Sequence, residues 1–300
     1  MLTLVPNFSE GRNRATLDAF EGAVRAVPGG YLLDIHADAF HHRSVFTIAG
    51  EAEPLLAAAY RTIAIARDII DLRTHTGQHP RVGAADVVPF APLDEEDMDV
   101  CIGLAAELGA RVGDELEIPV FLYGRAALKK GRRLPAQIRK PGLTRLGELI
   151  RTDPAWAPDF GPTALHPTAG AVMIGARKVL VAYNVFLDTD DVTVARRIAK
   201  EIRESAGGFP ALQALGFLVD GKAQVSMNLL NIDLTSPTQA FDAVAEAARR
   251  AGVGVLRSEV VGLMPERALP KEAERRLKLA GAGERVLEWR LKEVVGSQDR

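Results

Sequence analysis

The sequence contains a single cysteine, Cys101, among its 300 residues. One thiol cannot form a disulfide within the chain, and the mostly apolar neighbours at 98–104 predict a packed position inside a helix. A fold held together by disulfides, typical of small secreted domains, is therefore excluded. We expect the chain to work in a reducing compartment.

The sequence also has no strong excess of either charge and no long apolar run. There are 37 Lys and Arg against 39 Asp and Glu, which gives a formal net charge of −2, so no global field draws the protein to nucleic acid or to an anionic membrane. Nowhere do about 18 apolar residues follow one another. Residues 1–7 lack the basic start of an export signal. These features predict a cytoplasmic protein without a membrane span.

Several common catalytic motifs are missing as well. The sequence has no G-x-x-x-x-G-K-[ST] phosphate loop and no G-x-S-x-G nucleophile elbow, and no G-x-G-x-x-G follows its first apolar strand. These absences argue against an NTPase, a serine hydrolase of the elbow type and a Rossmann dehydrogenase.

The chain contains enough apolar residues to form one large hydrophobic core or two smaller ones. Hydrophobic residues make up 47% of the chain and charged residues 25%, so disorder is not expected. Short apolar runs predict strands, and apolar residues at helical spacing predict helices between them. The predicted strands are 3–8, 31–35, 44–49, 85–90, 119–123, 178–187, 212–219, 223–232 and 253–264, and the predicted helices are 13–27, 54–72, 95–116, 188–205 and 238–250.

This order of elements predicts an α/β (α+β) protein with two similar halves. Each half is expected to form a β-α-β-β-α-β unit, a mixed sheet with helices on one face. Between residues 129 and 170, frequent prolines and little periodicity predict a helix followed by a long surface connection. The expected domains are residues 1–177 and 178–300, and the second ends in a charged, helical tail at 270–300.

The segment 73–84 stands out because it combines two histidines and two arginines in a loop after a predicted helix. Loops of this kind often present functional groups on a rigid scaffold, although they can also be simply solvated. A zinc site is a further alternative, since His75 and His79 have the i, i+4 spacing of paired ligands. Gly77 and Pro80 interrupt the helix that such a pair needs, so no metal is expected.

Four stretches together resemble one enzyme family, the glutamate formiminotransferases. They are VPNFSEG (5–11), HPRVGA (79–84), WAPDFGP (156–162) and GARK (175–178). Weaker similarity continues through 224–230 to 261–263, so that the resemblance covers nearly the whole chain except its C-terminal tail.

The resemblance implies a reaction and a site. In that family the formimino group of N-formimino-L-glutamate passes to N5 of tetrahydrofolate, a cosubstrate, with release of glutamate, in histidine degradation. Two α/β subdomains are implied, with the folate in a tunnel between them. The histidine of the His-Pro-Arg motif is the proposed acid/base catalyst, which is His79 here. The folate-binding segment corresponds to Gly161, Pro162, Thr163, Ala164, Leu165, His166, Pro167, Thr168, Ala169 and Gly170.

The chemistry of the transfer suits a histidine. The folate nitrogen must lose a proton when it attacks the amidine carbon, and the departing glutamate amine must gain one. An imidazole, with an ordinary pKa of about 6.5, can accept and return that proton near neutral pH. Pro80 restricts the backbone of His79 toward an extended conformation, which helps to fix the direction of its ring.

Guanidiniums are expected near the histidine because both substrates are acidic. The donor is a dicarboxylate and the folate tail carries further carboxylates, which arginine can bind through two parallel hydrogen bonds. The candidates for carboxylate binding are Arg43, Arg81 and Arg177, with Lys178 a weaker one. The alternative for each is a structural ion pair.

The sequence departs from the animal members of the family at several positions. They carry serine and tryptophan where this chain has Thr168 and Ala169, so pterin stacking is expected to be weaker or supplied differently. They carry aspartate and asparagine where it has His36 and His42, which leaves the identity of the donor open. They also continue into a cyclodeaminase domain, for which a chain ending at Arg300 is too short.

Two other functions stay open at this stage. Formyl transfer between 5-formyl-tetrahydrofolate and glutamate would use the same histidine, and a folate-binding protein without turnover would use the same cleft. The expected partners are small molecules only, with no nucleic acid and no membrane. A homodimer through the second half is expected from the resemblance and from the prevalence of two-fold assemblies.

Overall fold

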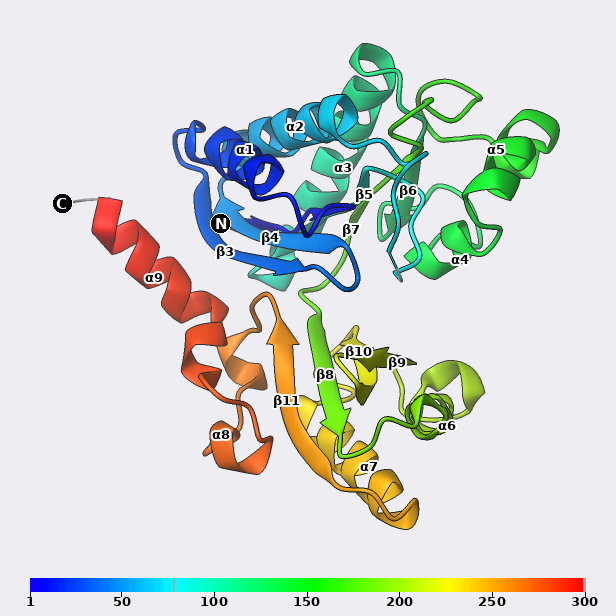
Figure 1. Cartoon of the computed structure of the whole chain (residues 1–300). Helices are drawn as coiled ribbons and strands as arrows, with labels where there is room; N and C mark the ends of the chain where they lie inside the picture. Colours follow the sequence, from blue (N-terminus) through cyan, green and yellow to red (C-terminus); the bar gives the residue numbers. More distant parts are fainter. Residues whose placement is uncertain (78, 299–300) are drawn as a thin grey trace. The chain divides into compact units, whose positions relative to one another are not determined.

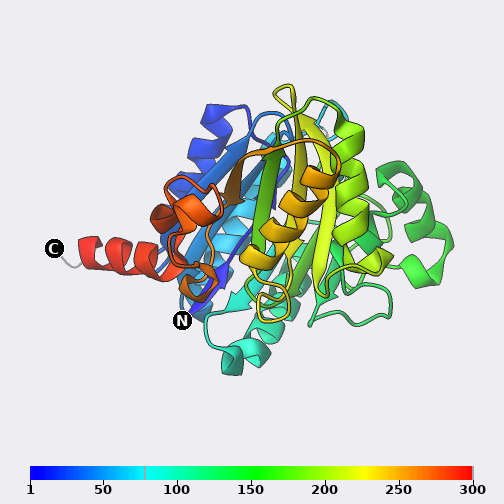
Figure 2. The ribbon, with the colours of Figure 1, turned by 90° about the horizontal axis from the view of Figure 1, so that it is seen from below.

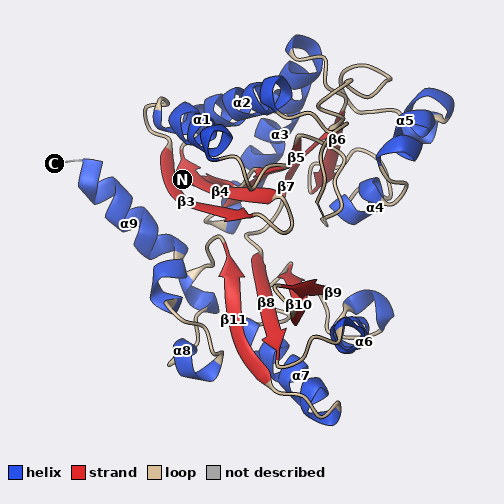
Figure 3. Ribbon diagram, viewed as in Figure 1, coloured by secondary structure: helices blue, strands red, loops and turns tan. Residues whose placement is uncertain are grey.

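The computed structural model describes residues 1–77 and 79–298. The chain divides into two compact units, Met1–Arg177 and Lys178–Arg300. Each unit has a sheet of its own, and Figure 3 shows how the strands and helices separate into layers within it.

The first unit is built on a sheet of seven strands (Figure 1). They are β1 (Leu2–Leu4), β2 (Asn7–Phe8), β3 (Tyr31–Asp38), β4 (Arg43–Gly50), β5 (Ala85–Pro92), β6 (Val120–Gly124) and β7 (Val172–Ala176). The hydrogen-bonded path runs β1-β4-β2-β5-β7-β6, and β3 pairs with β4. β7 runs parallel to both β5 and β6, whereas the other pairs are antiparallel. This sheet is therefore mixed, as predicted.

Three helices cover one face of this sheet: α1 (Arg14–Arg25), α2 (Ala52–Ile69) and α3 (Met98–Glu115). The side chain of Asn13 begins α1 by accepting hydrogen bonds from two backbone amides of its first turn. Beneath α1 the ring of Phe8 lies 4.1 Å from that of Phe20 and 5.6 Å from that of Phe46, measured between centroids. This aromatic cluster joins α1 to β2 and β4 within the main core of the unit.

The opposite face of the first sheet is covered only in part. Two short helices, α4 (Pro135–Arg139) and α5 (Leu143–Thr152), lie beside β6 in Figure 1. Ile138 and Leu146 of these helices form a second, smaller core with Phe121 of β6. The expectation of helices on one face alone is therefore incomplete for this unit, since α4 and α5 add a partial layer on the other face.

The sequence prediction missed β7. The segment 129–170, expected to hold one helix and then a surface connection, contains α4 and α5, and β7 follows it. β7 lies between β5 and β6 and is buried along its whole length. A strand buried on both faces shows no alternation of apolar and polar residues, so periodicity does not reveal it.

The second unit has four strands: β8 (Val181–Leu187), β9 (Leu212–Val219), β10 (Lys222–Leu229) and β11 (Val255–Val261). Their order is β11-β8-β10-β9, and every neighbouring pair is antiparallel. The prediction of a mixed sheet is wrong for this half. The strands β8 and β9, which α6 connects, run in the same direction, but β10 lies between them and runs opposite to both. No two neighbouring strands of this described sheet are therefore parallel.

Two helices, α6 (Val192–Ile202) and α7 (Pro237–Arg250), pack on one face of the second sheet (Figure 2). The hairpin of β9 and β10 turns at Asp220 and Gly221, which have φ of 49° and 72°. Positive φ at both central residues matches the right-handed twist of paired strands, which is the geometry of a two-residue hairpin turn.

The C-terminal part of the second unit is helical, with α8 (Ala273–Arg276) and α9 (Leu287–Gln298). α9 extends away from the rest of its unit in Figures 1 and 2. The side chain of Trp289 on α9 is 43% exposed, so α9 presents apolar surface that the described part of the chain does not cover. No helix in the described ranges has both the length and the apolar character needed to cross a membrane.

Candidate active site

The histidine-bearing loop connects α2 to β5 and is fixed at both ends. The amide of Leu72 donates to the carbonyl of Thr168 at 2.9 Å, and the amide of Ala84 donates to the carbonyl of Ala169 at 2.9 Å. Both acceptors, Thr168 and Ala169, belong to the segment 161–170, which was expected to contact folate.

His79 is a part-exposed residue of this loop. Its Nδ1 lies 2.7 Å from the carbonyl oxygen of Pro80. A carbonyl oxygen only accepts, so Nδ1 carries the hydrogen and the neutral ring keeps its lone pair on Nε2. Desolvation of the ring, followed by the positive charges of Arg43 and Arg139, holds the pKa of His79 well below its usual range. At neutral pH His79 is therefore an uncharged base in a fixed tautomer.

Arg43 and Arg139 are held by one buried carboxylate, Asp86. Arg43 Nη1 donates to Asp86 Oδ2 at 2.8 Å, and Arg139 donates to the same oxygen. The other carboxylate oxygen accepts the amide of Val82 at 2.8 Å. Burial opposes ionisation of Asp86, but the two guanidiniums and the Val82 amide hold its pKa well below the usual range. Two cations then share one anion, which leaves a net positive charge beside His79.

Arg139 was not among the candidates identified from the sequence. It ends α4, a helix of five residues whose apolar pattern is too short to be recognised. The Nε of Arg139 is buried and has no hydrogen-bond partner among the described residues. A buried donor of this kind is one that a bound acceptor could satisfy.

Arg81 has different surroundings from Arg43. Its guanidinium donates to the carbonyl of His75 at 2.9 Å, to that of Gly77 at 3.1 Å and to that of His79 at 3.2 Å. Arg81 therefore organises the backbone of the loop. Its role as a ligand for a substrate carboxylate stays a prediction.

Arg177 follows β7, at the far end of the strands from His79. Its amide donates at 3.1 Å to the carbonyl of Phe90, which lies four residues beyond Asp86 on β5, roughly 13 Å along the strand. Burial raises the pKa of the Tyr123 hydroxyl, and the nearby charge of Arg177 lowers it, with a smaller contribution from Arg139.

The segment 161–170 divides between two places. His166 and Gly170 close a turn through two backbone hydrogen bonds of 2.9 and 3.0 Å, and this turn holds the loop of His79. At the other end Gly161 packs on α3, where a Cβ on Gly113 would lie 2.6 Å from its amide nitrogen. Thr163 and Ala164, which connect the two ends, are exposed, and so is Pro167 within the turn.

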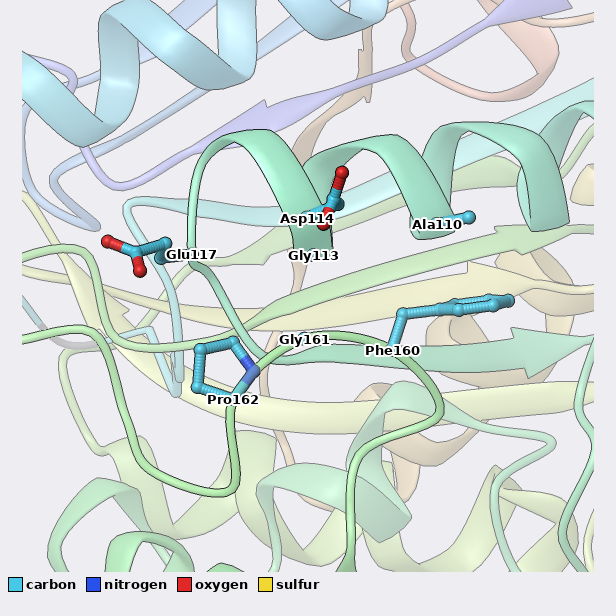
Figure 4. Close-up of a pocket in the computed structure, with 7 residues that line it drawn as sticks. All are labelled: Ala110, Gly113, Asp114, Glu117, Phe160, Gly161 and Pro162. Atoms are coloured by element: carbon cyan, nitrogen blue, oxygen red, sulfur yellow. The ribbon is translucent and has the colours of Figure 1, made fainter.

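A cavity of about 450 Å³ lies at the α3 end of this segment (Figure 4). Among the described residues that line it, the charged groups are the carboxylates of Asp114 and Glu117. Gly161 and Pro162 line it, but none of the described residues of the His79 loop does. Two carboxylates do not attract the anionic tail of a folate. The role of the segment 161–170 in folate binding stays a prediction.

The other histidines near His79 have partners of their own. His75 Nε2 lies 3.2 Å from the carbonyl oxygen of His42. The ring of His41 lies 6.3 Å from that of His79, measured between centroids, and its Nδ1 lies 2.8 Å from a carboxylate oxygen of Asp38. Among the residues that the structure describes, no group of three or more His, Cys, Asp or Glu is arranged to hold a metal ion.

Comparisons with known proteins agree with the motifs of the sequence. Residues 1–177 match the family described as formiminotransferase domain, N-terminal subdomain, and residues 182–280 match the formiminotransferase domain. The chain is 42% identical over 273 residues to a glutamate formimidoyltransferase of Streptococcus pyogenes serotype M1, which covers 90% of this chain and 91% of that protein.

Two further relatives show how far the similarity extends. A glutamate formimidoyltransferase of Thermoplasma acidophilum is 41% identical over 303 residues and covers 99% of both chains. A formimidoyltransferase-cyclodeaminase of Sus scrofa is 39% identical over 278 residues, which are 90% of this chain and 51% of that protein. The resemblance inferred from the sequence is confirmed, and the chain belongs to the formiminotransferase family.

Proposed function

We propose that this protein transfers the formimino group of N-formimino-L-glutamate to N5 of tetrahydrofolate and releases L-glutamate. The observation that carries the proposal is the state of His79, an uncharged imidazole with a fixed tautomer beside two guanidiniums. Two relatives that align with nearly the whole of this chain have the name glutamate formimidoyltransferase, which supports the same reaction.

His79 supplies the proton transfers that the reaction requires. N5 of tetrahydrofolate attacks the formimino carbon, and a new bond forms between that nitrogen and that carbon. Nε2 of His79 accepts the proton that N5 sheds. The imidazolium then returns this proton to the glutamate nitrogen as the bond between the carbon and that nitrogen breaks. His79 ends the cycle uncharged, as it began.

The positive charge around Asp86 has a second role in the proposal. Arg43 and Arg139 carry two positive charges against the single negative charge of Asp86, so an anionic substrate group is attracted to them. The buried Nε of Arg139 offers a hydrogen bond to such a group. We propose that these two arginines bind a carboxylate of the donor near His79. Arg81 and Arg177 remain candidates for the folate tail.

One assay tests the proposal against its alternatives. The purified protein is incubated with tetrahydrofolate and N-formimino-L-glutamate, and glutamate release and the folate spectrum are followed. We expect turnover by the unaltered protein and a loss of roughly 10²- to 10⁴-fold in His79→Gln, the usual contribution of acid/base catalysis. Arg73→Gln is the matched control, because Arg73 is 67% exposed in the same loop and its ion pair in the described part of the chain is with Asp71.

The same assay has outcomes that would overturn the proposal. Transfer from 5-formyl-tetrahydrofolate to glutamate, without turnover of the formimino donor, would make the protein a formyltransferase. Folate binding without turnover of either donor would make it a folate carrier. Equal activity in the unaltered protein and in His79→Gln would remove the histidine from the chemistry.

The setting of the enzyme is part of the proposal. The single cysteine is buried and unpaired, which suits a reducing compartment, and we propose the cytoplasm. A homodimer is proposed from the prevalence of two-fold assemblies, and light scattering tests it.

A further inference from the structure

Four described backbone carbonyls of the His79 loop, those of residues 75, 76, 77 and 79, are bound by the side chains of Arg81 and His42. Arg81 binds the carbonyls of His75, Gly77 and His79. The carbonyl oxygen of Thr76 lies 3.0 Å from Nδ1 of His42. His42 precedes β4 and is 14% exposed in its side chain.

The other nitrogen of His42 also faces an acceptor. Nε2 lies 3.0 Å from Glu10 Oε1, which accepts three backbone amides as well, those of Gly11 at 2.8 Å, Arg12 at 2.7 Å and Asn13 at 2.9 Å. Burial raises the pKa of Glu10, but these amides and His42 lower it by more, so the carboxylate is ionised.

The two hydrogen-bond partners of the His42 ring among the described residues are therefore groups that only accept. A carbonyl oxygen and an ionised carboxylate offer no hydrogen, so each ring nitrogen must carry one. A neutral imidazole has a single N–H and can satisfy only one of the two contacts. The arrangement around His42 requires an imidazolium.

A neutral ring lies against this cation. The rings of His42 and His75 are stacked, 4.1 Å apart between centroids and 13° from parallel. Burial, followed by the charges of Arg81 and His42, lowers the pKa of His75 to about 4, so His75 is uncharged at neutral pH. A cation over an uncharged aromatic face is a favourable contact, whereas two stacked cations would repel each other.

The backbone around His42 is also constrained. His42 has φ of 51°, the left-handed region that non-glycine residues adopt rarely. The loop approaches so closely that a Cβ on Gly77 would lie 2.7 Å from the carbonyl oxygen of His41 and 2.9 Å from Cβ of His42. Gly77 is therefore required for the contact between the two loops.

We propose that His42 is a positioning residue whose positive charge fixes the loop that carries His79, by joining the Thr76 carbonyl to the Glu10 carboxylate. The proposal rests on the proposed function in one respect, namely that His79 is the acid/base group. His42 itself touches neither the reacting atoms nor His79 in the described contacts. Its action passes through the backbone between Thr76 and His79.

The described groups around the His42 ring are consistent with a charged ring. The Glu10 carboxylate lies within hydrogen-bond distance of Nε2, and the uncharged His75 is stacked on the ring, with Arg81 beyond it. A neutral His42 ring would satisfy only one of its two acceptors, so the loop would be released on that side.

The first test measures the protonation of the ring itself. Nitrogen-15 NMR of the full-length protein at pH 7 should show both ring nitrogens of His42 carrying hydrogen, and His75 as a neutral ring with hydrogen on Nε2. A neutral His42 at this pH would overturn the proposal. This measurement requires no substrate, so it stands whether or not formimino transfer is found.

The second test measures how firmly the loop is held. His42→Asn keeps a side chain that tolerates positive φ and donates a hydrogen bond, but it removes the titratable charge. We expect amide hydrogen exchange at Gly77 and His79 to rise roughly 10- to 100-fold at pH 7, the effect of losing one charge-assisted hydrogen bond. Arg73→Gln is the control, and its loop exchange should match the unaltered protein.

Kinetics separate a positioning role from a general loss of structure. In His42→Asn we expect a lower kcat with little change in the KM for tetrahydrofolate. Unchanged exchange together with an unchanged kcat would overturn the proposal. If the protein transfers no formimino group, the NMR and exchange results still decide whether the charge of His42 holds the loop.

Discussion

Arg43 and Asp86 form an ion pair of 2.8 Å across a third strand, although 43 residues separate them in sequence. Arg43 begins β4 and Asp86 lies near the start of β5, and β2 runs between these two strands. On its way across β2 the guanidinium of Arg43 also donates to the side chain of Asn7 at 2.9 Å. The charged centre of the site is therefore built on one edge of a single sheet.

Loss of the charge on Asp86 is expected to destabilise the protein. The carboxylate is fully buried, and Asp86→Asn would leave two guanidiniums without their anion. Breaking a buried pair in this way costs about 3–5 kcal/mol in the free energy of unfolding. Urea unfolding at pH 7 measures the change.

The pH dependence of that effect follows from the direction of the shift. The native pKa of Asp86 is depressed, so its contribution is present above the unfolded value of about 3.9 and is lost as the pH falls through the lower native value. The difference in the free energy of unfolding between Asp86→Asn and the unaltered protein should therefore shrink in strong acid. Asp71→Asn, which breaks a solvent-screened surface pair with Arg73, should change stability far less than Asp86→Asn does. A similar loss in both variants would contradict the importance of burial.

The acid limb of the pH profile should report His79. Its pKa is depressed, so the uncharged base persists below the ordinary histidine value of about 6.5. We expect kcat/KM for the formimino donor to rise with pH along a limb centred below pH 6.5, because kcat/KM reports groups of the free enzyme. A limb centred at or above that value would mean that the ring is not held near two cations in solution.

Arg139 can be tested through the same profile. Its positive charge is one of the causes that lower the pKa of His79, so Arg139→Gln should raise that pKa and move the acid limb to higher pH. The variant should also raise the KM for the donor if Arg139 binds a substrate carboxylate. Arg133→Gln is the matched control, because Arg133 is exposed in the same segment and its replacement removes the same charge. A shift of equal size in both variants would reflect net charge alone.

Apart from Arg43, the parts of the site that the sequence revealed lie within one short segment. The loop at 73–84 attracted notice because histidine, arginine and glycine occur together there, and the family motif pointed to His79 within it. The direction of each side chain could not be read in this way. Arg81 and Arg43 were equal candidates, yet Arg81 binds carbonyls of its own loop and Arg43 reaches Asp86.

The parts that the sequence did not reveal depend on contacts between distant segments. Arg139 meets Asp86 across 53 residues, from a helix too short for its periodicity to be recognised. The same limit explains β7, which pairs with β5 and β6 in the middle of the sheet and shows no alternation. Most other strands and helices were predicted because each has an apolar pattern of its own.

The attachment of the loop to the turn at 166–170 leads to the last prediction. Gly83 pairs with Gly170 at this junction, and a Cβ on Gly83 would lie 1.9 Å from the carbonyl oxygen of Ala171. The backbone at Ala171 cannot move away from this Cβ without breaking the hydrogen bonds that pair it with the loop just before β7 begins. Gly83→Ala should therefore destabilise the protein by several kcal/mol, in the range of about 2–5 kcal/mol known for severe packing clashes and lost backbone contacts.

A second glycine provides the contrast for this substitution. Gly103 lies inside α3, is exposed, and a Cβ there would meet nothing within 4 Å. Gly103→Ala should stabilise the protein by about 0.5–1 kcal/mol, because alanine loses less backbone entropy in a helix. Thermal and urea unfolding of both variants measure the two effects, and they should have opposite signs. Equal stability in Gly83→Ala and the unaltered protein would mean that the loop of His79 is not clamped at this junction as the described contacts require.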